Sequence, residues 1–398
     1  MVVGTLTLGW IVLYFDRSLL FPLLPVMADE FDLNATQQGA ITSIFFLLYV
    51  AVQVPSGILG DRLGLRRILT FMYFMAGLAL VGIGVFSISY FMLLFFVAME
   101  GFGSGAYYSG SYGITLSSVP QHHRGVSSAI VTSGMAIGFA LGLSLSGVLY
   151  TLMGSWRPPF LIMAIPTFLM VLVFSVTLRR VPTPPVTKGG LSFIFSNKNT
   201  VSLLAVNFCA LYAYWVMVSW GPSYLFEERG LSLSRSGAYT SIVAIFSLGG
   251  ALLWGRLSDR VGRKKLSLLL LVMAATTLIL FVQVTSTFML ILILAVYGLF
   301  GGLAWNPIFV SWVSDHTSAS GRIGMGTAMG VVNTAGMSSS FVAPVVSGWL
   351  TDLSGSLDWA FYVGGGVCLL GIVFALITEE TVTSSSARKN PGEQDAKT

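Results

Sequence analysis

The sequence predicts an all-α integral membrane protein whose twelve transmembrane helices form two six-helix bundles. Three features support this fold class: an apolar composition, a series of membrane-length apolar segments, and a charged motif that occurs once in each half. Hydrophobic residues make up 55% of the 398 residues, charged residues only 9%, and the mean hydropathy is +0.83. Soluble domains carry about 25% charged residues, so the composition excludes a soluble fold.

Apolar segments long enough to cross a bilayer, which takes about 20 residues, recur along the chain. In the first half they cover residues 4–27, 39–60, 68–88, 90–118, 126–152 and 158–178, and in the second half 201–226, 236–257, 266–284, 287–314, 323–351 and 358–378. We therefore expect an N-terminal bundle over 1–178, a linker over 179–200, a C-terminal bundle over 201–378 and a disordered polar tail over 379–398.

A repeated motif relates the two halves. Gly57-Ile58-Leu59-Gly60-Asp61-Arg62-Leu63-Gly64-Leu65-Arg66-Arg67 returns in outline, 198 residues later, as Gly255-Arg256-Leu257-Ser258-Asp259-Arg260-Val261-Gly262-Arg263-Lys264-Lys265. Each copy joins the second and third apolar segments of its half, which is typical of transporters made of two similar halves. Glycine-rich helices follow at matching places, with Gly134, Gly138, Gly142 and Gly147 in one and Gly330, Gly336 and Gly348 in the other. Four-residue glycine spacing predicts tight helix crossing at the interface between the halves.

The distribution of basic residues predicts the orientation in the membrane. With the amino terminus inside, seventeen of the 21 Lys and Arg residues fall on the inner side, Arg157, Arg229 and Arg235 fall outside, and Arg17 lies within a span. This asymmetry satisfies the positive-inside rule for an even number of spans. We therefore expect a multi-pass protein of the plasma membrane with the linker and both termini in the cytoplasm. The topology also accounts for the net charge of +5, so nucleic-acid binding is not expected.

Three ionisable residues lie well inside the predicted spans, namely Asp16 and Arg17 in the first and Glu100 in the fourth. A charge at the bilayer centre costs about 2.5–3.5 kcal/mol on insertion scales, so it is rarely without function. Asp16 and Arg17 point about 100° apart around a helix, so they cannot both face a central cavity. The planar fork of Arg17 suits a carboxylate or a phosphate. Glu100 is either a group that gains and loses a proton or the partner of Arg17 in a permanent salt bridge.

The repeated motif also supplies candidate gating residues. These are Asp61, Arg62, Arg66, Asp259, Arg260 and Arg263. An Asp at a helix end can accept hydrogen bonds from the amino terminus of a neighbouring helix, and an adjacent Arg can join helices through charge-assisted bonds. Contacts that form in one conformation and break in another act as a gate. The alternative is that the basic residues only anchor the helices at the headgroup level.

The repeated motif resembles the loop signature of the major facilitator superfamily, which lies between the second and third helices of each six-helix half. A narrower resemblance is to the anion:cation symporter branch, which includes sugar-acid and phthalate uptake proteins. It rests on Asp16-Arg17-Ser18-Leu19, on Tyr49, Gln53, Pro55 and Gly57, and on Trp220-Gly221-Pro222 and Asn333-Thr334. The resemblance implies uptake of an organic anion with protons. It further implies that Arg17 binds the substrate carboxylate, Asp16 couples to protons, and Tyr49 and Asn333 line the pocket.

The fourth span departs from that branch. Its members usually carry an Arg there with a Glu seven residues later, whereas this span has no Arg and holds Glu100 in a different register. The departure favours a monoanion, such as a monocarboxylate or a sugar acid, over a dicarboxylate. Other polar and aromatic residues at mid-span depth are candidates to line a small-molecule pocket. They are Gln53, Tyr107, Tyr108, Asn207, Trp215, Trp305 and Asn306.

Two other classes of protein stay open at this point. An enzyme is disfavoured because the loops hold no catalytic constellation and the duplicated motif indicates transport. A proton-coupled exporter of drugs or other small amphiphilic compounds would use Asp16 and Glu100 to bind a cation. Cys209 and Cys368 lie in apolar segments, and the histidines lie in loops, so we expect no metal and no cofactor. The expected partners are an organic anion, protons and the lipid bilayer, and we expect a monomer.

Overall fold

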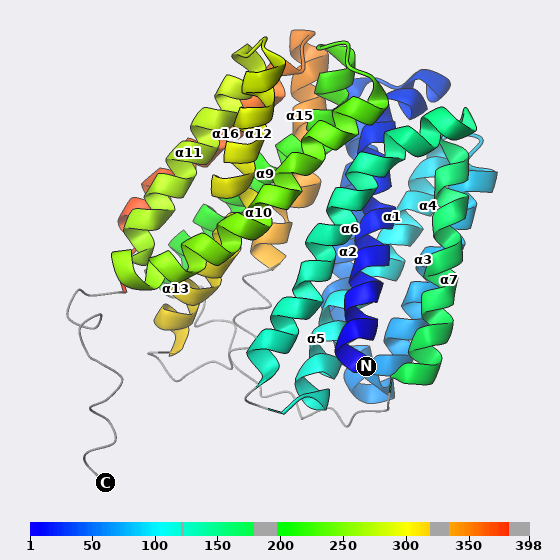
Figure 1. Ribbon diagram of the computed structural model, residues 1–398, viewed down its shortest axis with the longest axis horizontal. Coiled ribbons are helices and arrows are strands. Elements are labelled where there is room, and N and C mark those ends of the chain that lie inside the picture. The colour runs from blue at the N-terminus through cyan, green and yellow to red at the C-terminus, as the bar shows by residue number, and fades with distance from the viewer. Residues whose placement is uncertain (121–122, 179–196, 319–333, 382–398) are drawn as a thin grey trace. The chain divides into compact units, whose positions relative to one another are not determined.

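The computed structural model describes residues 1–120, 123–178, 197–318 and 334–381. All regular elements in these ranges are helices (Figure 1), which confirms the predicted all-α class. They are α1 (Val2–Phe31), α2 (Ala35–Leu63), α3 (Leu65–Phe86), α4 (Tyr90–Ser104), α5 (Ala106–Ser118), α6 (Arg124–Met153), α7 (Arg157–Thr177), α9 (Lys198–Glu227), α10 (Leu233–Val261), α11 (Arg263–Gln283), α12 (Thr287–Phe300), the short 3-10 helix η2 (Gly302–Trp305), α13 (Asn306–Ser318), α15 (Ser339–Ser354) and α16 (Asp358–Ile377). Within the described ranges, 11 helical segments are long and apolar enough to cross a membrane. The remaining predicted span, 323–351, begins outside the described residues, and its later part is α15.

Two predicted spans are broken near their middle. The segment predicted over 90–118 is α4 followed by α5, and the segment predicted over 287–314 is α12, η2 and α13. The first break follows a glycine-rich stretch in which a Cβ on Gly101 would collide with the carbonyl group of Phe45 on α2. The second break contains Gly302, whose φ of +51° lies in the left-handed region that favours glycine. A search for apolar segments does not reveal these breaks, because no charged residue interrupts either predicted span at the break.

Contacts divide the chain into two compact units. The first comprises Met1–Val186, Trp215–Ile245 and Met337–Val363, and the second comprises Thr187–Tyr214, Phe246–Gly336 and Gly364–Thr398. Helices α9, α10 and α16 each contribute to both units. The predicted bundles over 1–178 and 201–378 are a different division of the chain and stay a prediction.

In the first unit, α1 packs along α6 through glycines. A Cβ on Gly134, Gly138 or Gly142 would collide with backbone carbonyl groups of α1. The prediction that these three glycines lie between the halves of the chain is therefore wrong, since α1 and α6 belong to the same half. Four-residue spacing fixes that the glycines share one helix face, but it does not fix which neighbour that face meets.

Two other glycines of the predicted set do meet the opposite half of the chain, and both contacts lie in the first unit. Gly147 on α6 lies against the backbone of Leu233 and Ser234 at the start of α10. Gly348 on α15 lies against Ala35 at the start of α2. Leu233 follows Ala35 by 198 residues, so the two crossings occupy equivalent places in the repeat.

Polar contacts add to the second of these crossings. Asp352, near the end of α15, accepts hydrogen bonds from the backbone N–H groups of Ala35 and Thr36, each at 2.9 Å. This carboxylate therefore caps the amino terminus of α2, where a negative charge is favourable. The indole nitrogen of Trp220 on α9 donates to the carbonyl oxygen of Pro344 on α15 at 3.1 Å. Helices from both halves are thus joined at the end of the first unit that the predicted topology assigns to the outer side.

Candidate functional site

A cage of aromatic rings surrounds the guanidinium group of Arg17 on α1. The Arg17 side chain is buried, with 2% of its surface exposed. Five rings from α1, α2 and α9 lie close to its central carbon, Cζ. The distances from Cζ to the ring centroids are 4.0 Å for Phe46, 4.9 Å for Tyr14, 5.0 Å for Tyr49, 5.1 Å for Trp215 and 5.2 Å for Phe45.

Within the described part of the chain, the hydrogen-bonding capacity of this guanidinium group is unused. None of its three nitrogen atoms has a hydrogen-bond partner among the residues that the structure describes. Aromatic faces attract a cation by about 0.5–2 kcal/mol each, but they accept none of its five N–H bonds in the usual way. A buried charge without a partner is strongly unfavourable. The cage therefore holds a cation whose bonding an anion would complete.

Asp16, the preceding residue, is directed to a different neighbour, as its separation from Arg17 around the helix predicts. Its Oδ2 atom lies 2.8 Å from the hydroxyl oxygen of Thr167 on α7. The same hydroxyl lies 2.8 Å from the carbonyl oxygen of Met163, one turn earlier on α7. A threonine hydroxyl has one proton, so it cannot donate to both oxygens at once. The carboxyl group of Asp16, which is 3% exposed, therefore sits beside a hydroxyl that can donate to it or accept from it.

Glu100 on α4 completes the group of buried charges. It is 4% exposed and interacts electrostatically with both Asp16 and Arg17. Among the side chains that the structure describes, Glu100 forms no salt bridge, and the alternative of a permanent bond between Arg17 and Glu100 is not realised here. Three ionisable groups therefore lie near one another without neutralising one another in fixed pairs.

Several predicted pocket residues gather at the Arg17 cage. Tyr49 and Trp215 contribute rings to it, and Gln53 interacts with Tyr49 from the next turn of α2. Tyr107 lies elsewhere, because its hydroxyl donates to the carbonyl oxygen of Leu6 at 2.8 Å and its ring belongs to the packed core of α1, α3, α5 and α7. Tyr108 is partly buried, with its ring near those of Tyr112 and Trp10.

The remaining predicted pocket residues belong to the second unit. The indole nitrogen of Trp305 donates to the side-chain oxygen of Asn207 at 3.1 Å. A Cβ at position 336 would collide with the amide nitrogen of Asn207. Glycine at this position therefore leaves room for the Asn207 side chain that pairs with Trp305. Asn306 begins α13 and is partly buried. Asn333 lies outside the described residues.

Four residues around Arg17 and Asp16 were not predicted from the sequence. Phe46 precedes Tyr49 and Gln53 by three and seven residues, so the face of α2 that carries those two predicted residues extends to it. Tyr14 stands in the same relation to Arg17 on α1. Helical register is therefore a signal that finds both rings, and Phe45 is the neighbour of Phe46. Thr167 has no such signal, because it is one of many hydroxyl residues within spans.

The candidate gating residues of the second half form an ionic network. Arg263 pairs with Asp315 on α13 at 2.8 Å and with the exposed Asp259 at 3.5 Å. Glu380, after α16, accepts hydrogen bonds from the backbone N–H groups of Arg263 and Lys264 at 3.0 and 2.9 Å. The network joins three helices, α10, α11 and α13, to the segment after α16. Arg260, also predicted to act in gating, is exposed.

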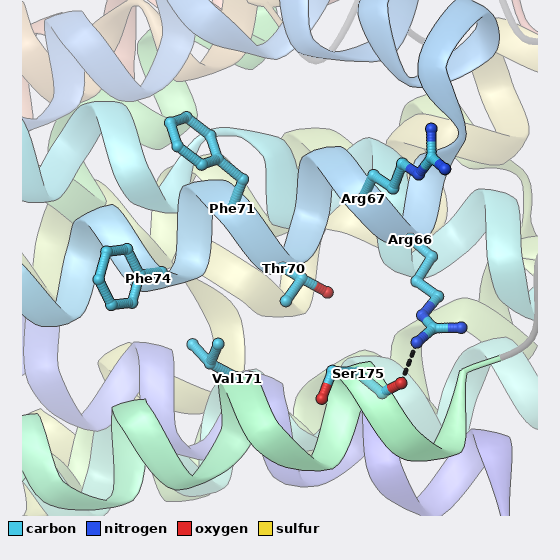
Figure 2. A pocket seen from close by; sticks show the side chains of 7 residues that line it. All are labelled: Arg66, Arg67, Thr70, Phe71, Phe74, Val171 and Ser175. Carbon is cyan, nitrogen blue, oxygen red and sulfur yellow. Dashed lines mark hydrogen bonds between the residues drawn. The ribbon is translucent and has the colours of Figure 1, made fainter.

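The corresponding residues of the first half are arranged differently. Arg66 donates a hydrogen bond to the carbonyl oxygen of Ser175 near the end of α7 (Figure 2), as Lys264 does to that of Leu376 near the end of α16. Arg62 is exposed, and the side chain of Asp61 lies outside the described part of the structure. The position equivalent to Arg263 is Leu65, so the first half has no arginine in the place of the residue at the centre of that network.

Comparison with known proteins agrees with this architecture. The family profile of the Major Facilitator Superfamily matches residues 6–335 and 250–397. Two solved structures share the fold: a bacterial homologue of the human lysosomal transporter Spinster (TM-score 0.75, 17% identity, 94% of each chain covered) and the nucleoside transporter NupG (TM-score 0.78, 15% identity, 95% of this chain and 99% of that one). They confirm the predicted fold of two six-helix halves as a fold class.

Curated relatives with similar sequences cover most of the chain. The probable sulfoacetate transporter SauU of Cupriavidus necator is 26% identical over 99% of this chain and 96% of its own length. The probable galactarate/D-glucarate transporter GarP of Escherichia coli is 28% identical over 90% of each chain. The hexuronate transporter of Bacillus subtilis is 27% identical over 92% of this chain and 90% of its own length.

Proposed function

The chain belongs to the Major Facilitator Superfamily, and from that premise we propose that it carries a small organic monoanion across the plasma membrane together with protons. As a member of this family it is a multi-pass membrane transporter and not an enzyme. The observation that carries the proposal is the buried guanidinium group of Arg17, which has no polar partner among the described residues. A carboxylate that enters the aromatic cage would supply that partner.

The chemistry of the cage supports an anionic substrate. Arg presents a planar fork of donors that matches a carboxylate in two parallel hydrogen bonds. The surrounding rings exclude water, so such bonds form in a medium of low dielectric constant, where they are stronger than in water. The named substrates of the relatives are all organic anions: hexuronates carry one acidic group, whereas sulfoacetate, galactarate and glucarate carry two. We therefore assign the carboxylate-binding role to Arg17.

The charge count supports a monoanion. Arg17 is the one Lys or Arg that is fully buried among the residues that the structure describes. One guanidinium group neutralises one carboxylate, whereas a second carboxylate would need another cation nearby. The substrate class we favour is thus a monocarboxylate or a sugar acid with a single carboxyl group.

Asp16 and Thr167 support coupling to protons. If Asp16 is protonated, its O–H donates to the Thr167 hydroxyl, which in turn donates to the Met163 carbonyl group. If Asp16 is ionised, the Thr167 hydroxyl turns and donates to the carboxylate instead. A hydrogen bond between Asp16 and Thr167 therefore forms whether Asp16 is protonated or ionised. Such an environment suits a carboxyl group that gains and loses a proton in each cycle. Glu100 is the second proton-coupling candidate, because its charge acts on both Asp16 and Arg17.

Alternating access requires contacts that break when the protein changes conformation. We propose that the contacts of Asp352 with Ala35 and Thr36 close the outer side in this conformation. The ionic network around Arg263 and the last turn of α2, which holds Asp61, are the candidate gates of the cytoplasmic side, with both chain termini in the cytoplasm. A monomer suffices for this cycle, because each chain holds both halves.

Uptake assays with purified protein in liposomes test the proposal. The panel consists of a labelled hexuronate with one carboxylate, a labelled galactarate with two, and a cationic dye, each under an imposed pH gradient. We expect the hexuronate to accumulate when the outside is acidic and to stop accumulating when the gradient is collapsed. Gradient-driven movement of the dye without movement of either acid would replace the proposal with the drug-exporter alternative.

A further inference from the structure

A groove on the flank of the first unit has the shape and chemistry of a lipid site. It lies between α3 and α7, has a volume of about 470 Å³, and is seen from close by in Figure 2. Arg66, Arg67, Thr70, Phe71 and Phe74 line it from α3, and Val171 and Ser175 line it from α7. None of these lining residues belongs to the Arg17 cage.

The groove is basic at one end and apolar at the other. Arg66 and Arg67 stand in the first turn of α3, Thr70 follows one turn later, and the two phenylalanines come next (Figure 2). Phe71 is 57% exposed and Phe74 is 40% exposed. Large exposed rings on a membrane span face the hydrocarbon of the bilayer, so the groove opens toward lipid.

The basic end lacks internal compensation. Arg66 donates to the carbonyl oxygen of Ser175, which is a neutral acceptor. Neither Arg66 nor Arg67 forms a salt bridge with a side chain that the structure describes. The hydroxyl oxygen of Thr70 is shielded from solvent and has no hydrogen-bond partner in the described part of the chain. Two positive charges and one unsatisfied hydroxyl therefore line the same end of the groove, which the predicted topology places at the headgroup level.

We propose that this groove binds an anionic phospholipid. Its phosphate accepts hydrogen bonds from Arg66, Arg67 and Thr70, while one acyl chain lies along Phe71, Phe74 and Val171. The two guanidinium groups exceed the charge of one phosphate, and no carboxylate among the lining residues is available for the amine of a zwitterionic headgroup. By the positive-inside rule this end of α3 is cytoplasmic, and the cytoplasmic leaflet is the one whose anionic lipids attract basic residues.

The equivalent place in the second half makes a contrast. Lys265 follows Arg67 by 198 residues and is likewise exposed. Its neighbours Arg263 and Lys264, however, lie beside Glu380, Asp315 and Asp259. In the second half, acidic residues of the protein thus provide the negative charge that a lipid phosphate provides in the groove. Lys265 is therefore a matched control for Arg67.

Lipid binding to the full-length protein tests the proposal. Purified protein in zwitterionic detergent is titrated with phosphatidylglycerol, with phosphatidylcholine and with inorganic phosphate, and the bound lipid is counted by native mass spectrometry. We expect phosphatidylglycerol to bind more tightly than phosphatidylcholine. Arg67→Gln should weaken phosphatidylglycerol binding about fivefold, the factor that corresponds to about 1 kcal/mol per basic residue near a membrane surface. Thr70→Val should weaken it in the same direction, whereas Lys265→Gln should leave it within twofold of the parent.

Three outcomes would overturn the proposal. Equal affinity for the two lipids would mean that the groove has no preference for an anionic headgroup. Inhibition of phosphatidylglycerol binding by millimolar inorganic phosphate, without any effect of Phe74→Ala, would identify a soluble-anion site instead. An effect of Lys265→Gln as large as that of Arg67→Gln would reduce the preference to general attraction by surface charge. Arg66 is left unchanged in these variants, because its bond to Ser175 joins α3 to α7.

Discussion

Two buried or nearly buried arginines, one in each half of the chain, have opposite environments. Arg263 pairs with Asp315 at 2.8 Å and with Asp259 at 3.5 Å, and Glu380 accepts from its backbone N–H. Arg17 is more deeply buried, yet its guanidinium group meets aromatic rings and no hydrogen-bond acceptor among the described residues. The protein places two carboxylates within salt-bridge distance of the first arginine, and among the described residues it places none within that distance of the second.

The difference separates a structural role from a binding role. A charge that the protein itself neutralises stabilises a conformation, and its removal leaves a partner unpaired. A charge that the protein leaves unpaired costs stability, which is tolerated where a ligand completes the bonding. We therefore propose that Arg263 stabilises the conformation and that Arg17 binds the substrate.

The largest expected effect comes from Arg17→Gln. Uptake of the organic anion should fall about 30-fold or more, because truncation of one member of a desolvated charge pair costs about 2–5 kcal/mol. The melting temperature should stay the same or rise, because the variant removes an unpaired buried charge. Uptake into liposomes and thermal unfolding in detergent measure the two quantities. A clear fall in melting temperature would mean that Arg17 stabilises the fold, and would contradict the distinction between Arg17 and Arg263.

Arg263→Gln should show the reverse pattern. The unfolding free energy should fall by roughly 1–3 kcal/mol, because Asp315 loses its charged partner, while substrate affinity stays near that of the parent. Because the two residues interact, the double variant Arg263→Gln with Asp315→Asn should lose less stability than the two single changes added together. Additive losses in thermal unfolding would mean that the ion pair contributes nothing.

Thr167→Val should move the pH dependence of uptake, with Thr167→Ser as its control. The groups around Asp16 that carry charge or titrate are Arg17 on α1, Tyr73 on α3 and Glu100 on α4. Valine removes a donor that the ionised carboxylate needs more than the neutral acid does, because hydrogen bonds to a charged group are the stronger kind. The variant should therefore hold its proton more tightly, and the pH of half-maximal uptake should rise. Serine keeps the hydroxyl and should keep the parent profile, and a valine variant with that same profile would remove Thr167 from the coupling.

The smallest expected effect concerns the cage itself. Phe46→Leu removes the ring nearest to Arg17, at 4.0 Å, and a cation–π contact is worth about 0.5–2 kcal/mol. We expect substrate affinity to change by roughly 2–10-fold, measured from the concentration dependence of uptake. Phe95→Leu is the matched control, since Phe95 is 62% exposed on the flank of α4. Equal effects of both variants would mean that the ring has no specific role.

The different environments of Arg17 and Arg263 could be predicted only in part from the sequence. Arg17, Asp16 and Glu100 stand out in the sequence as candidate functional residues, because charges within apolar spans are rare. Their neighbours could not be predicted in the same way, because pairing depends on which helix faces meet. The sequence left open a salt bridge between Arg17 and Glu100, and the fold directs Arg17 toward α2 and α9 instead.

Similar reasons separate the predictable from the unpredictable parts of the fold. Hydropathy and the 198-residue repeat suffice for the helical class and for the spans, because apolar length is a property of the chain itself. The breaks after Ser104 and at Gly302 depend on how closely neighbouring helices approach. The glycines of α6 were expected between the halves, yet three of them pack against α1. Residue spacing determines which side chains share a helix face, but only the tertiary structure determines which helix packs against that face.

Substrate binding by two conservative variants tests the central claim most directly. The dissociation constant of a hexuronate is measured by calorimetry for the parent, for Arg17→Lys and for Arg263→Lys, all in the same detergent and at the same pH. Lysine keeps the charge but loses the planar fork, so we expect Arg17→Lys to weaken binding about tenfold or more and Arg263→Lys to change it less than twofold. Unchanged binding by Arg17→Lys, or equal losses in both variants, would contradict the assignment of the unpaired arginine to the substrate.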